Sequence, residues 1–348
     1  MDRRRFVAGA FAAASSFPGG AQAQAAPIFI GDMHFHSFFG ESTYHSRPVA
    51  KALAAGSATL VAWSLTGDLL WFDFKIWKPK SPPKAGEALG WFEREAGRIK
   101  AHIAEQGLKI VRTASDIDRA LRGEPHVVLA VEGATFIEND AARVGTAHGL
   151  GLRHLQLVHY IHNSIGDIQT DTPQHQGLSE LGKQVVRECN RLGVLVDVAH
   201  CTEAAIRDVL SISRKPVVYS HGSVARGPAA GASALIWRRR QLPLDTAKEI
   251  ARNGGVVGLW TLAPDVGPTI EAYADRMVEL ADWLGEDHVA FGTDLNGLAR
   301  LGMLQGYADL RRVIDHWISK GMAQDRIRKL AIGNYARVLK TSLQVGRA

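Results

Sequence analysis

The stretch IFIGDMHFHSFFG, residues 28–40, is an apolar run that ends in two histidines separated by one phenylalanine. In an extended strand, side chains at positions i and i+2 share a face, so the imidazoles of His34 and His36 would point the same way. Neutral imidazole is a common metal ligand. An isolated pair of this kind also fits ordinary polar pockets at a strand end, so the rest of the chain must decide between the two interpretations.

Further short apolar runs follow, and amphipathic stretches with helical spacing separate them. The predicted strands are residues 28–34, 58–64, 127–131, 154–158, 194–199, 216–220, 255–259 and 288–293. Residues 179–192 and 271–284 have the apolar periodicity of helices. Eight strand–helix units over this length predict an α/β fold of the (β/α)8 TIM-barrel type.

Two features bear on this fold prediction. A ninth short run, residues 109–112, exceeds the count, and we expect it outside the barrel. An open doubly wound sheet is the alternative architecture, but no glycine-rich phosphate loop follows the first predicted strand. No linker rich in Pro, Gly or Ser divides the chain, which predicts a single barrel domain over residues 26–348.

Residues 1–25, MDRRRFVAGAFAAASSFPGGAQAQA, have the pattern of a secretory signal. The arginines at positions 3–5 resemble a twin-arginine signal, and the apolar part is too short for a membrane anchor. We expect cleavage after Ala23 or Ala25 and export to the periplasm. The alternative is an amphipathic helix belonging to the mature domain.

The net charge bears on nucleic-acid binding, and the two cysteines bear on a possible disulfide. Removal of three arginines and one aspartate with the signal lowers the formal net charge from +6 to +4, which gives no indication of nucleic-acid binding. Cys189 and Cys201 both lie in segments that are predicted to be buried, which argues against a disulfide between them.

Metal-capable side chains lie at the ends of six of the predicted strands. They are His34, His36, Glu132, His159, His200, His221 and Asp294. Barrel active sites lie at the carboxyl ends of the strands, so this shared placement predicts a metal site. The number of ligands favours two metals rather than one. In VLVDVAH, residues 194–200, alternation places His200 on the face of the valines and Asp197 on the other, which favours a structural role for Asp197.

Several motifs then resemble one family. QGLSELGKQVVRECNRLGVLVDVAHCT, residues 176–202, is similar to the long central motif of the renal (membrane) dipeptidases, zinc peptidases within the amidohydrolase-like barrels. VEGA, LQLVHYIHNSIGD, YSHGS and FGTDLNG resemble further motifs of that family, in the same order. The similarity runs from about residue 30 to about residue 335.

This resemblance implies a site for two zinc ions, which other divalent metals could also fill, and a dipeptide or related amide as substrate. Glu132 would bridge the metals; His34, His36 and Asp294 would hold one, and His200 and His221 the other. A metal-bridging hydroxide would attack the peptide bond, with Asp294 transferring the proton and His159 contacting the substrate carbonyl. The family also implies tolerance of a D-residue on the C-terminal side and leaves a homodimer open.

The substrate region departs from the family pattern. The first strand carries His36 where H-x-D is usual, and WRRRQLP, residues 237–243, replaces the R-N stretch, which makes Arg240 our candidate for binding the substrate carboxylate. Arg240 as a solvated surface residue is the alternative. The arginine of SHGSVAR stands one place later than usual, and Asn296 replaces an aspartate. These differences leave open a hydrolase of the same fold that acts on another amide, a lactone or an ester.

Two further alternatives remain at this point. A metal-stabilised binding protein without catalysis is disfavoured by the complete ligand set. The aromatic segment 63–77, with Trp71, Phe72, Phe74 and Trp77, is either a lid or wall of the pocket, or a loop that packs on the barrel or on a second subunit.

Overall fold

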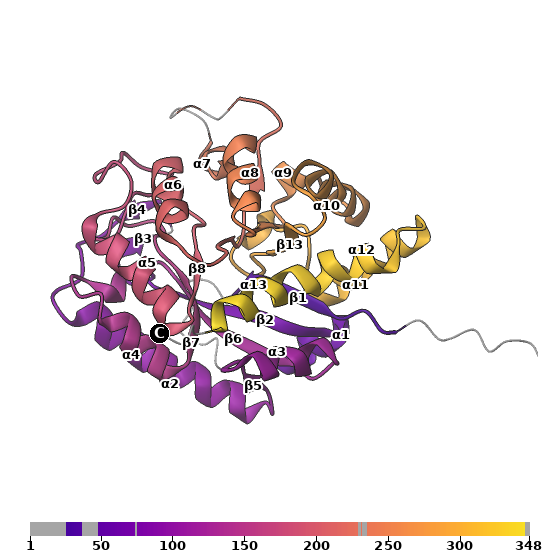
Figure 1. Cartoon of the computed structure of the whole chain (residues 1–348), viewed down its shortest axis with the longest axis horizontal. Coiled ribbons are helices and arrows are strands. Elements are labelled where there is room, and N and C mark those ends of the chain that lie inside the picture. The colour runs from indigo at the N-terminus through magenta and orange to yellow at the C-terminus, as the bar shows by residue number, and fades with distance from the viewer. Residues whose placement is uncertain (1–25, 37–47, 74, 229–230, 232–234, 345–348) are drawn as a thin grey trace, which may run out of the picture.

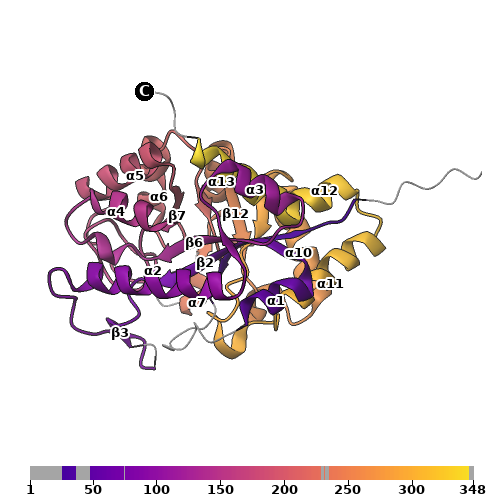
Figure 2. The same ribbon diagram turned by 90° about the horizontal axis from the view of Figure 1, so that it is seen from below.

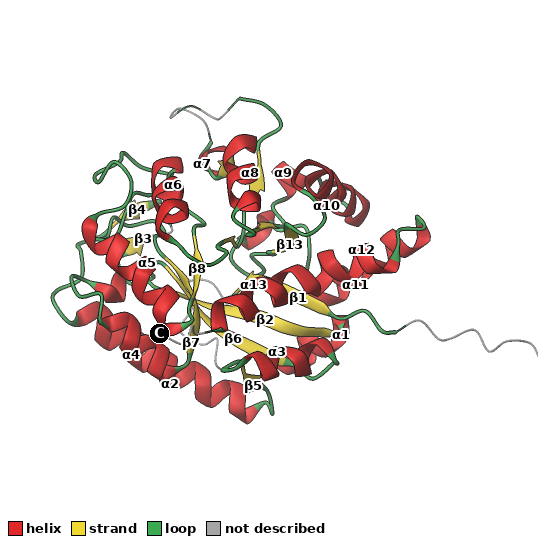
Figure 3. Cartoon of the chain, in the orientation of Figure 1, coloured by secondary structure: helices red, strands yellow, loops and turns green. Residues whose placement is uncertain are grey.

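Eight parallel strands form the centre of the molecule, and helices surround them (Figure 1; Figure 3). The computed structural model describes residues 26–36, 48–73, 75–228, 231 and 235–344. The strands of the barrel, in spatial order, are β1 (Ile30–Phe35), β2 (Ala58–Thr66), β6 (His126–Glu132), β7 (Leu152–Gln156), β8 (Leu195–Asp197), β9 (Val218–Tyr219), β12 (Val256–Leu259) and β13 (Val289–Phe291). The predicted signal peptide and Phe74 lie outside the described residues.

The barrel is nearly closed between its first and last strands. A parallel bridge joins Phe35 to Leu295, beyond the end of β13. The amide of Asp294 donates to the carbonyl of His34 at 3.0 Å, and the amide of His36 donates to the carbonyl of Leu295 at 2.9 Å. The predicted (β/α)8 barrel is therefore confirmed, and the open doubly wound sheet is excluded.

All eight predicted strands exist, with shifted boundaries. β7 is displaced as a whole, since it begins and ends two residues earlier than predicted. The short run at residue 109 forms β5 (Lys109–Ile110), which pairs with β6 outside the barrel path, as expected. Two separate two-stranded sheets lie outside the barrel: β3 (Phe72–Asp73) pairs with β4 (Lys78–Pro79), and β10 (Ser223–Val224) pairs with β11 (Gln241–Leu242).

The α-helices alternate with the strands along the chain. They are α1 (Val49–Gly56), α2 (Glu87–Glu105), α3 (Ala114–Leu121), α4 (Arg143–Leu150), α5 (Glu180–Leu192), α6 (Glu203–Ile212), α7 (Ile236–Arg239), α8 (Leu244–Arg252), α9 (Ala263–Val266), α10 (Ile270–Leu284), α11 (Tyr307–Ser319), α12 (Gln324–Arg328) and α13 (Asn334–Leu343). Short 3₁₀ or π turns, η2 (Thr135–Ile137), η3 (Ala299–Leu301) and η4 (Lys329–Gly333), complete the set. Ser179 caps α5 by accepting the amide of Gly182, and Thr269 caps α10 in the same way with Ala272.

Two apolar layers pack on the strands. The interior layer takes side chains such as Met33, Ala62, Ala130 and Leu195, and residues of α3 and α13 join it. These two helices lie side by side (Figure 2) and cover the end of the barrel away from the candidate site. The outer layer packs the opposite strand faces against the surrounding helices.

In the structure, the side chains of residues 194–200 do not alternate over the whole segment as predicted. The valines Val196 and Val198 pack in the outer layer, while Leu195 packs in the interior. Because β8 ends at Asp197, alternation does not extend to His200, which instead adopts a positive φ of 67° and turns toward the barrel mouth. Asp197 accepts the amides of Ala199 and Ser220 at 2.9 and 3.0 Å, as expected of a structural group.

Three further observations concern the two cysteines, membrane-spanning helices and the aromatic segment 63–77. Cys189 and Cys201 are buried free thiols. In the described part of the chain, no helix is both long enough and apolar enough to cross a membrane. In the aromatic segment, Trp71 and Phe72 are buried and pack on Trp91 and Tyr160, whereas Trp77 is 41% exposed.

Candidate metal centre

The seven strand-end side chains meet at one rim of the barrel. Two belong to strands: His34 to β1 and Glu132 to the end of β6. The others lie in the segments that directly follow strands β1, β7, β8, β9 and β13: His36, His159, His200, His221 and Asp294. All seven are buried, and this rim holds the carboxyl ends of the strands.

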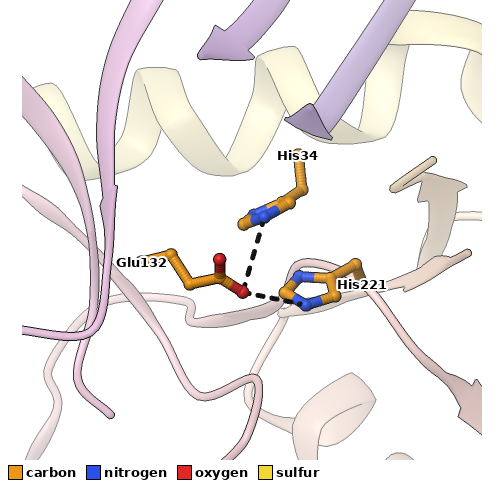
Figure 4. A group of neighbouring side chains, drawn as sticks. All are labelled: His34, Glu132 and His221. Atoms are coloured by element: carbon orange, nitrogen blue, oxygen red, sulfur yellow. Dashed lines mark ion pairs between the residues drawn. The ribbon is translucent and has the colours of Figure 1, made fainter. Parts of the chain in front are cut away.

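The Glu132 carboxylate lies at the centre of the group. Its Oε1 lies 3.2 Å from Nε2 of His200, 3.3 Å from that of His221 and 3.6 Å from that of His34. His159 also directs Nε2 toward Oε1, at 3.3 Å. The second oxygen, Oε2, lies 3.4 Å from Nε2 of His36. Figure 4 shows His34 and His221 directed at the same carboxylate oxygen.

Three overlapping groups have ligand atoms close enough to hold a metal ion. They are His34, His36 and Asp294; His34, Glu132 and His221; and Glu132, His159 and His200. The first group is the set that the family resemblance assigned to one ion. His200 and His221, assigned to the other ion, direct their Nε2 atoms toward each other at 3.2 Å and toward Glu132.

The outer nitrogens of these histidines show that the donor set fits a cation. Nδ1 of His36 lies 3.0 Å from the carbonyl oxygen of Ser64, to which it can only donate. Its Nε2 is then unprotonated in the neutral ring, yet it lies 3.1 Å from Nε2 of His34. Nδ1 of His34 and of His221 contact the hydroxyls of Ser64 and Ser220. The lone pair on Nε2 of His36 is directed into a buried group of ring nitrogens, where a metal ion would satisfy it, and outer partners that orient the rings are usual at metal sites.

Burial and neighbouring charges shift the pKa values of the group. Burial raises the pKa of Glu132, but the surrounding imidazoles, His159 and His34 first, outweigh it and hold that pKa well below its usual range. Burial, together with the charge of His221, holds the pKa of His34 well below 6.5; for His200 the second cause is Arg240. An ionised carboxylate beside neutral imidazoles is the state that binds a metal.

His36 and Asp294 behave differently. The carboxylates of Glu132 and Asp294 overcome the effect of burial and raise the pKa of His36. Burial, reinforced by the charge of Glu132, raises the pKa of Asp294. Nε2 of His36 lies 3.6 Å from Oδ1 of Asp294. A metal ion bound between His36 and Asp294 would compete with a proton for these two side chains.

Tight backbone turns direct the candidate ligands. Asp294 and Asn296 have positive φ values of 52° and 66°, which non-glycine residues seldom adopt. Gly297 follows, and a Cβ at this position would lie 2.1 Å from Oδ1 of Asp294. At Gly133, with φ of 83°, a Cβ would lie 2.9 Å from that of His159. The two glycines therefore leave room for the side chains on which the site depends.

A cavity of about 330 Å³ opens above the metal-binding residues. Arg240 lines it and is only 2% exposed, so it is not a solvated surface residue. Its Nε donates to Oε1 of Gln169 at 3.1 Å, and its Nη2 donates to the carbonyl of His221 at 3.2 Å. Burial lowers the pKa of Arg240, but the neighbouring Tyr219 and Tyr160 reverse this effect, and the guanidinium stays charged.

Sequence reasoning missed several residues that shape the site. Asp68 accepts Nδ1–H of His159 at 2.6 Å and the amides of Tyr160 and Ile161 at 2.8 and 3.1 Å. It follows the end of β2, so the rule that located the other seven could have identified it. Gln169 had no such signal, because its contact with Arg240 depends on the path of a long loop. Of the aromatic segment, Trp77 lines the cavity.

Comparison with known proteins identifies the family. The model of the membrane dipeptidases, peptidase family M19, matches residues 74–348. The chain belongs to the membrane dipeptidase family. This confirms the resemblance that the sequence motifs indicated.

Curated relatives of this membrane dipeptidase family chain include two fungal proteins. Dipeptidase tcpJ of Claviceps purpurea is 29% identical over 243 residues, 67% of this chain and 55% of that protein. Dipeptidase aclJ of Aspergillus oryzae is 31% identical over 233 residues, 64% of this chain and 52% of that protein. The chain thus spans about half the length of the curated relatives that it matches.

Solved structures support the barrel fold of the family. A metallo peptidase from Rhodobacter sphaeroides, liganded with a phosphinate mimic of the dipeptide L-Ala-D-Ala, aligns with a TM-score of 0.74 and 23% identity, over 90% of this chain and 99% of that one. The probable dipeptidase PvdM from Pseudomonas aeruginosa aligns with a TM-score of 0.76 and 20% identity, over 92% and 96% of the two chains.

Proposed function

We propose that this chain is an exported dipeptidase that uses two zinc ions to hydrolyse the peptide bond of a dipeptide. The observation that carries the proposal is the Glu132 carboxylate, which has five imidazole nitrogens within 3.6 Å at the base of a cavity that also holds a buried arginine. Membership of the membrane dipeptidase family and the names of the relatives support it. Export follows from the arginine-containing N-terminal pattern alone.

The residues present suit two ions. One would be held by His34, His36 and Asp294, the other by His200 and His221, with Glu132 shared between them; zinc accepts such nitrogen and oxygen ligands. A bound pair of divalent ions supplies Lewis acidity toward the scissile carbonyl and a hydroxide nucleophile at neutral pH.

Arg240 is suited to orient the substrate. A guanidinium has five N–H donors; two contact Gln169 and the carbonyl of His221, and the hydroxyls of Tyr160 and Tyr219 also lie beside the group. Donors on its terminal nitrogens can hold the terminal carboxylate of a dipeptide in a bidentate pair. This contact fixes the scissile bond relative to Glu132.

Two side chains are suited to move or stabilise charge. Burial and Glu132 raise the pKa of Asp294, which favours a carboxyl group that can take a proton and pass it to the leaving amine. Asp68 and Glu132 overcome burial and raise the pKa of His159, which favours an imidazolium whose Nε2–H stabilises the developing oxyanion.

A hydrolysis panel on zinc-reconstituted protein tests the proposal. The panel contains L,L and L,D dipeptides, the C-terminal amides of the same dipeptides, a lactone and an N-acyl amino acid. We expect turnover of dipeptides that a chelator abolishes, and much weaker turnover of the amides, which lack the carboxylate for Arg240. Dipeptides that stay intact while zinc is bound contradict the proposal.

One observation favours a second candidate, a hydrolase of the same fold acting on another amide, a lactone or an ester. His36 stands where the family pattern has an aspartate, and Gln241 follows Arg240 where an asparagine is usual. His36 lines the cavity, and Gln241 directly follows the cavity-lining Arg240. Turnover of the lactone or the N-acyl amino acid, with inert dipeptides, would establish this alternative.

A further inference from the structure

The walls of the cavity above the metal centre are apolar. They are formed by Trp77, Tyr160, Ile236, Trp237, Trp260 and Leu298, among others. Apart from Arg240 and the strand-end side chains of the candidate metal centre, the described residues that line the cavity carry no charged side chain. An apolar cavity with a few convergent polar groups is the usual form of a site that selects its ligand by side-chain burial.

These apolar groups gather around Arg240. Ile236 and Trp237 belong to α7, which ends directly before Arg240. The Trp260 ring lies 5.4 Å from Cζ of Arg240. The substrate residue whose carboxylate pairs with Arg240 therefore has its side chain among these walls.

The aromatic walls are held by contacts of their own. Nε1 of Trp260 donates to Asp265 at 2.7 Å, so the polar atom of this indole already has a partner. Tyr160 stacks on Phe72 at 5.3 Å and meets the edge of Trp77 at 4.9 Å. The walls present fixed, uncharged surfaces to the ligand.

We propose that the site selects dipeptides whose C-terminal residue has a bulky apolar side chain, aromatic or branched aliphatic. The proposal rests on the function proposed above, because Arg240 must hold the C-terminal carboxylate. An apolar side chain gains from leaving water in such a cavity. A charged side chain would lose its hydration without gaining a partner.

Dipeptides with a constant N-terminal alanine test the selection on zinc-loaded protein. We expect kcat/KM for Ala-Phe and Ala-Leu to exceed that for Ala-Ala by about 10- to 100-fold, because a few buried carbon atoms in an apolar pocket give discrimination of this order. Ala-Glu and Ala-Lys should be the poorest substrates. Equal rates for Ala-Ala and Ala-Phe, or a preference for a charged residue, would overturn the selection while the dipeptidase function stands.

Binding of the product amino acid gives a readout that needs no turnover. Phenylalanine, in the L or D form, should bind the zinc-loaded protein at least tenfold more tightly than alanine in calorimetric titrations. If no dipeptide is cleaved, the function proposed above fails; tighter binding of phenylalanine would still support the apolar recognition, and equal binding would overturn it as well.

A matched pair of variants locates the selectivity. Trp237 and Trp283 are both half-buried, and each has an arginine stacked on its ring, at 5.4 and 4.9 Å, but only Trp237 lines the cavity. Trp237→Ala should lower the ratio of Ala-Phe to Ala-Ala turnover by about tenfold, whereas Trp283→Ala should leave it unchanged. An unchanged ratio in Trp237→Ala, with native circular dichroism, would overturn the proposal.

Discussion

At Glu132, four imidazole nitrogens surround one carboxylate oxygen at 3.2–3.6 Å, and the fifth contacts the other oxygen. Buried imidazole nitrogens need partners. The negative charge of Glu132 attracts a cation, and a cation can bind several of these nitrogens at once. A neutral amide of the same shape would keep the packing and remove the charge. The substitution Glu132→Gln therefore separates charge from shape.

We predict that Glu132→Gln lowers kcat on the order of 10³-fold and reduces bound zinc below two equivalents per chain. Steady-state kinetics and elemental analysis of the purified protein measure the two effects. Glu93→Gln, at an exposed position of α2, is the control and should change neither. Full activity in Glu132→Gln would exclude the shared carboxylate from the mechanism.

Asp68 contacts the candidate site through His159, and its hydrogen bonds reach none of the other candidate metal-binding side chains. We predict that Asp68→Asn lowers kcat about 10- to 100-fold with little change in KM or zinc content, since the ring loses its charged partner. Asp73→Asn, on the neighbouring β3, is the matched control. A loss of zinc in Asp68→Asn, or an unchanged kcat, would contradict a role confined to positioning His159.

Among the elements, the barrel strands were the easiest to predict, because buried parallel strands are nearly continuous apolar runs. The first two residues of β7, Leu152 and Arg153, were missed because Arg153 is polar but buried. Arg153 donates to the carbonyls of Arg112 and His148, and His154 contacts Asp197 at 3.2 Å. Arg112 and Asp197 lie more than 40 residues away in the chain, so no local pattern predicts the start of this strand.

The grouping of the candidate ligands could be predicted from the sequence, but the walls of the cavity could not. The ligands follow strand ends, whose common rim is a property of the fold. Trp77, Trp237 and Trp260 reach the cavity from three separate segments, and their meeting depends on how those segments pack. The loop that carries Gln169 is the clearest case, since its position decides how Arg240 is held.

That loop is organised by one buried carboxylate, Asp167. Its oxygens accept the amides of Gln174, His175 and Gly177 at 2.6–2.8 Å. Burial raises the pKa of Asp167, but the amides, that of His175 first, outweigh it and lower the pKa below 3.8. Because the folded-state pKa lies below the unfolded one, the stabilisation is complete above the unfolded pKa and disappears as the pH falls through the folded pKa.

We therefore predict that Asp167→Asn lowers the free energy of unfolding by about 1–3 kcal/mol at pH 7, because three amides lose a charged acceptor. The difference from the unsubstituted protein should shrink as the pH falls below 3.8. Urea denaturation at pH 7 and at pH 3 measures both quantities, with Asp171→Asn, at an exposed position of the same loop, as the control. An equal difference at the two pH values would exclude the ionised carboxylate as the cause.

For the molecule as a whole, the candidate metal centre spans the seam where the barrel closes. β1 and the segment after β13 are joined by the bridge from Phe35 to Leu295, with the amides of His36 and Asp294 as donors across the seam. His34 and His36 lie on one side and Asp294 on the other. An ion bound by these three residues would cross-link the first and last strands of the barrel.

We predict that removal of zinc lowers the melting temperature by roughly 10 °C, since two ions at about a hundredfold above their dissociation constants add several kcal/mol to the stability of a domain of this size. Protection from amide exchange should be lost near the seam before it is lost in the rest of the chain. Amide exchange in peptides covering residues 28–36 and 289–296 should accelerate first when a chelator is added. Peptides from α2 and α5, which contribute no ligand, should keep their protection at temperatures below the transition. Uniform acceleration across the chain, or an unchanged melting temperature after zinc is shown to be lost, would mean that the ions do not hold the seam closed.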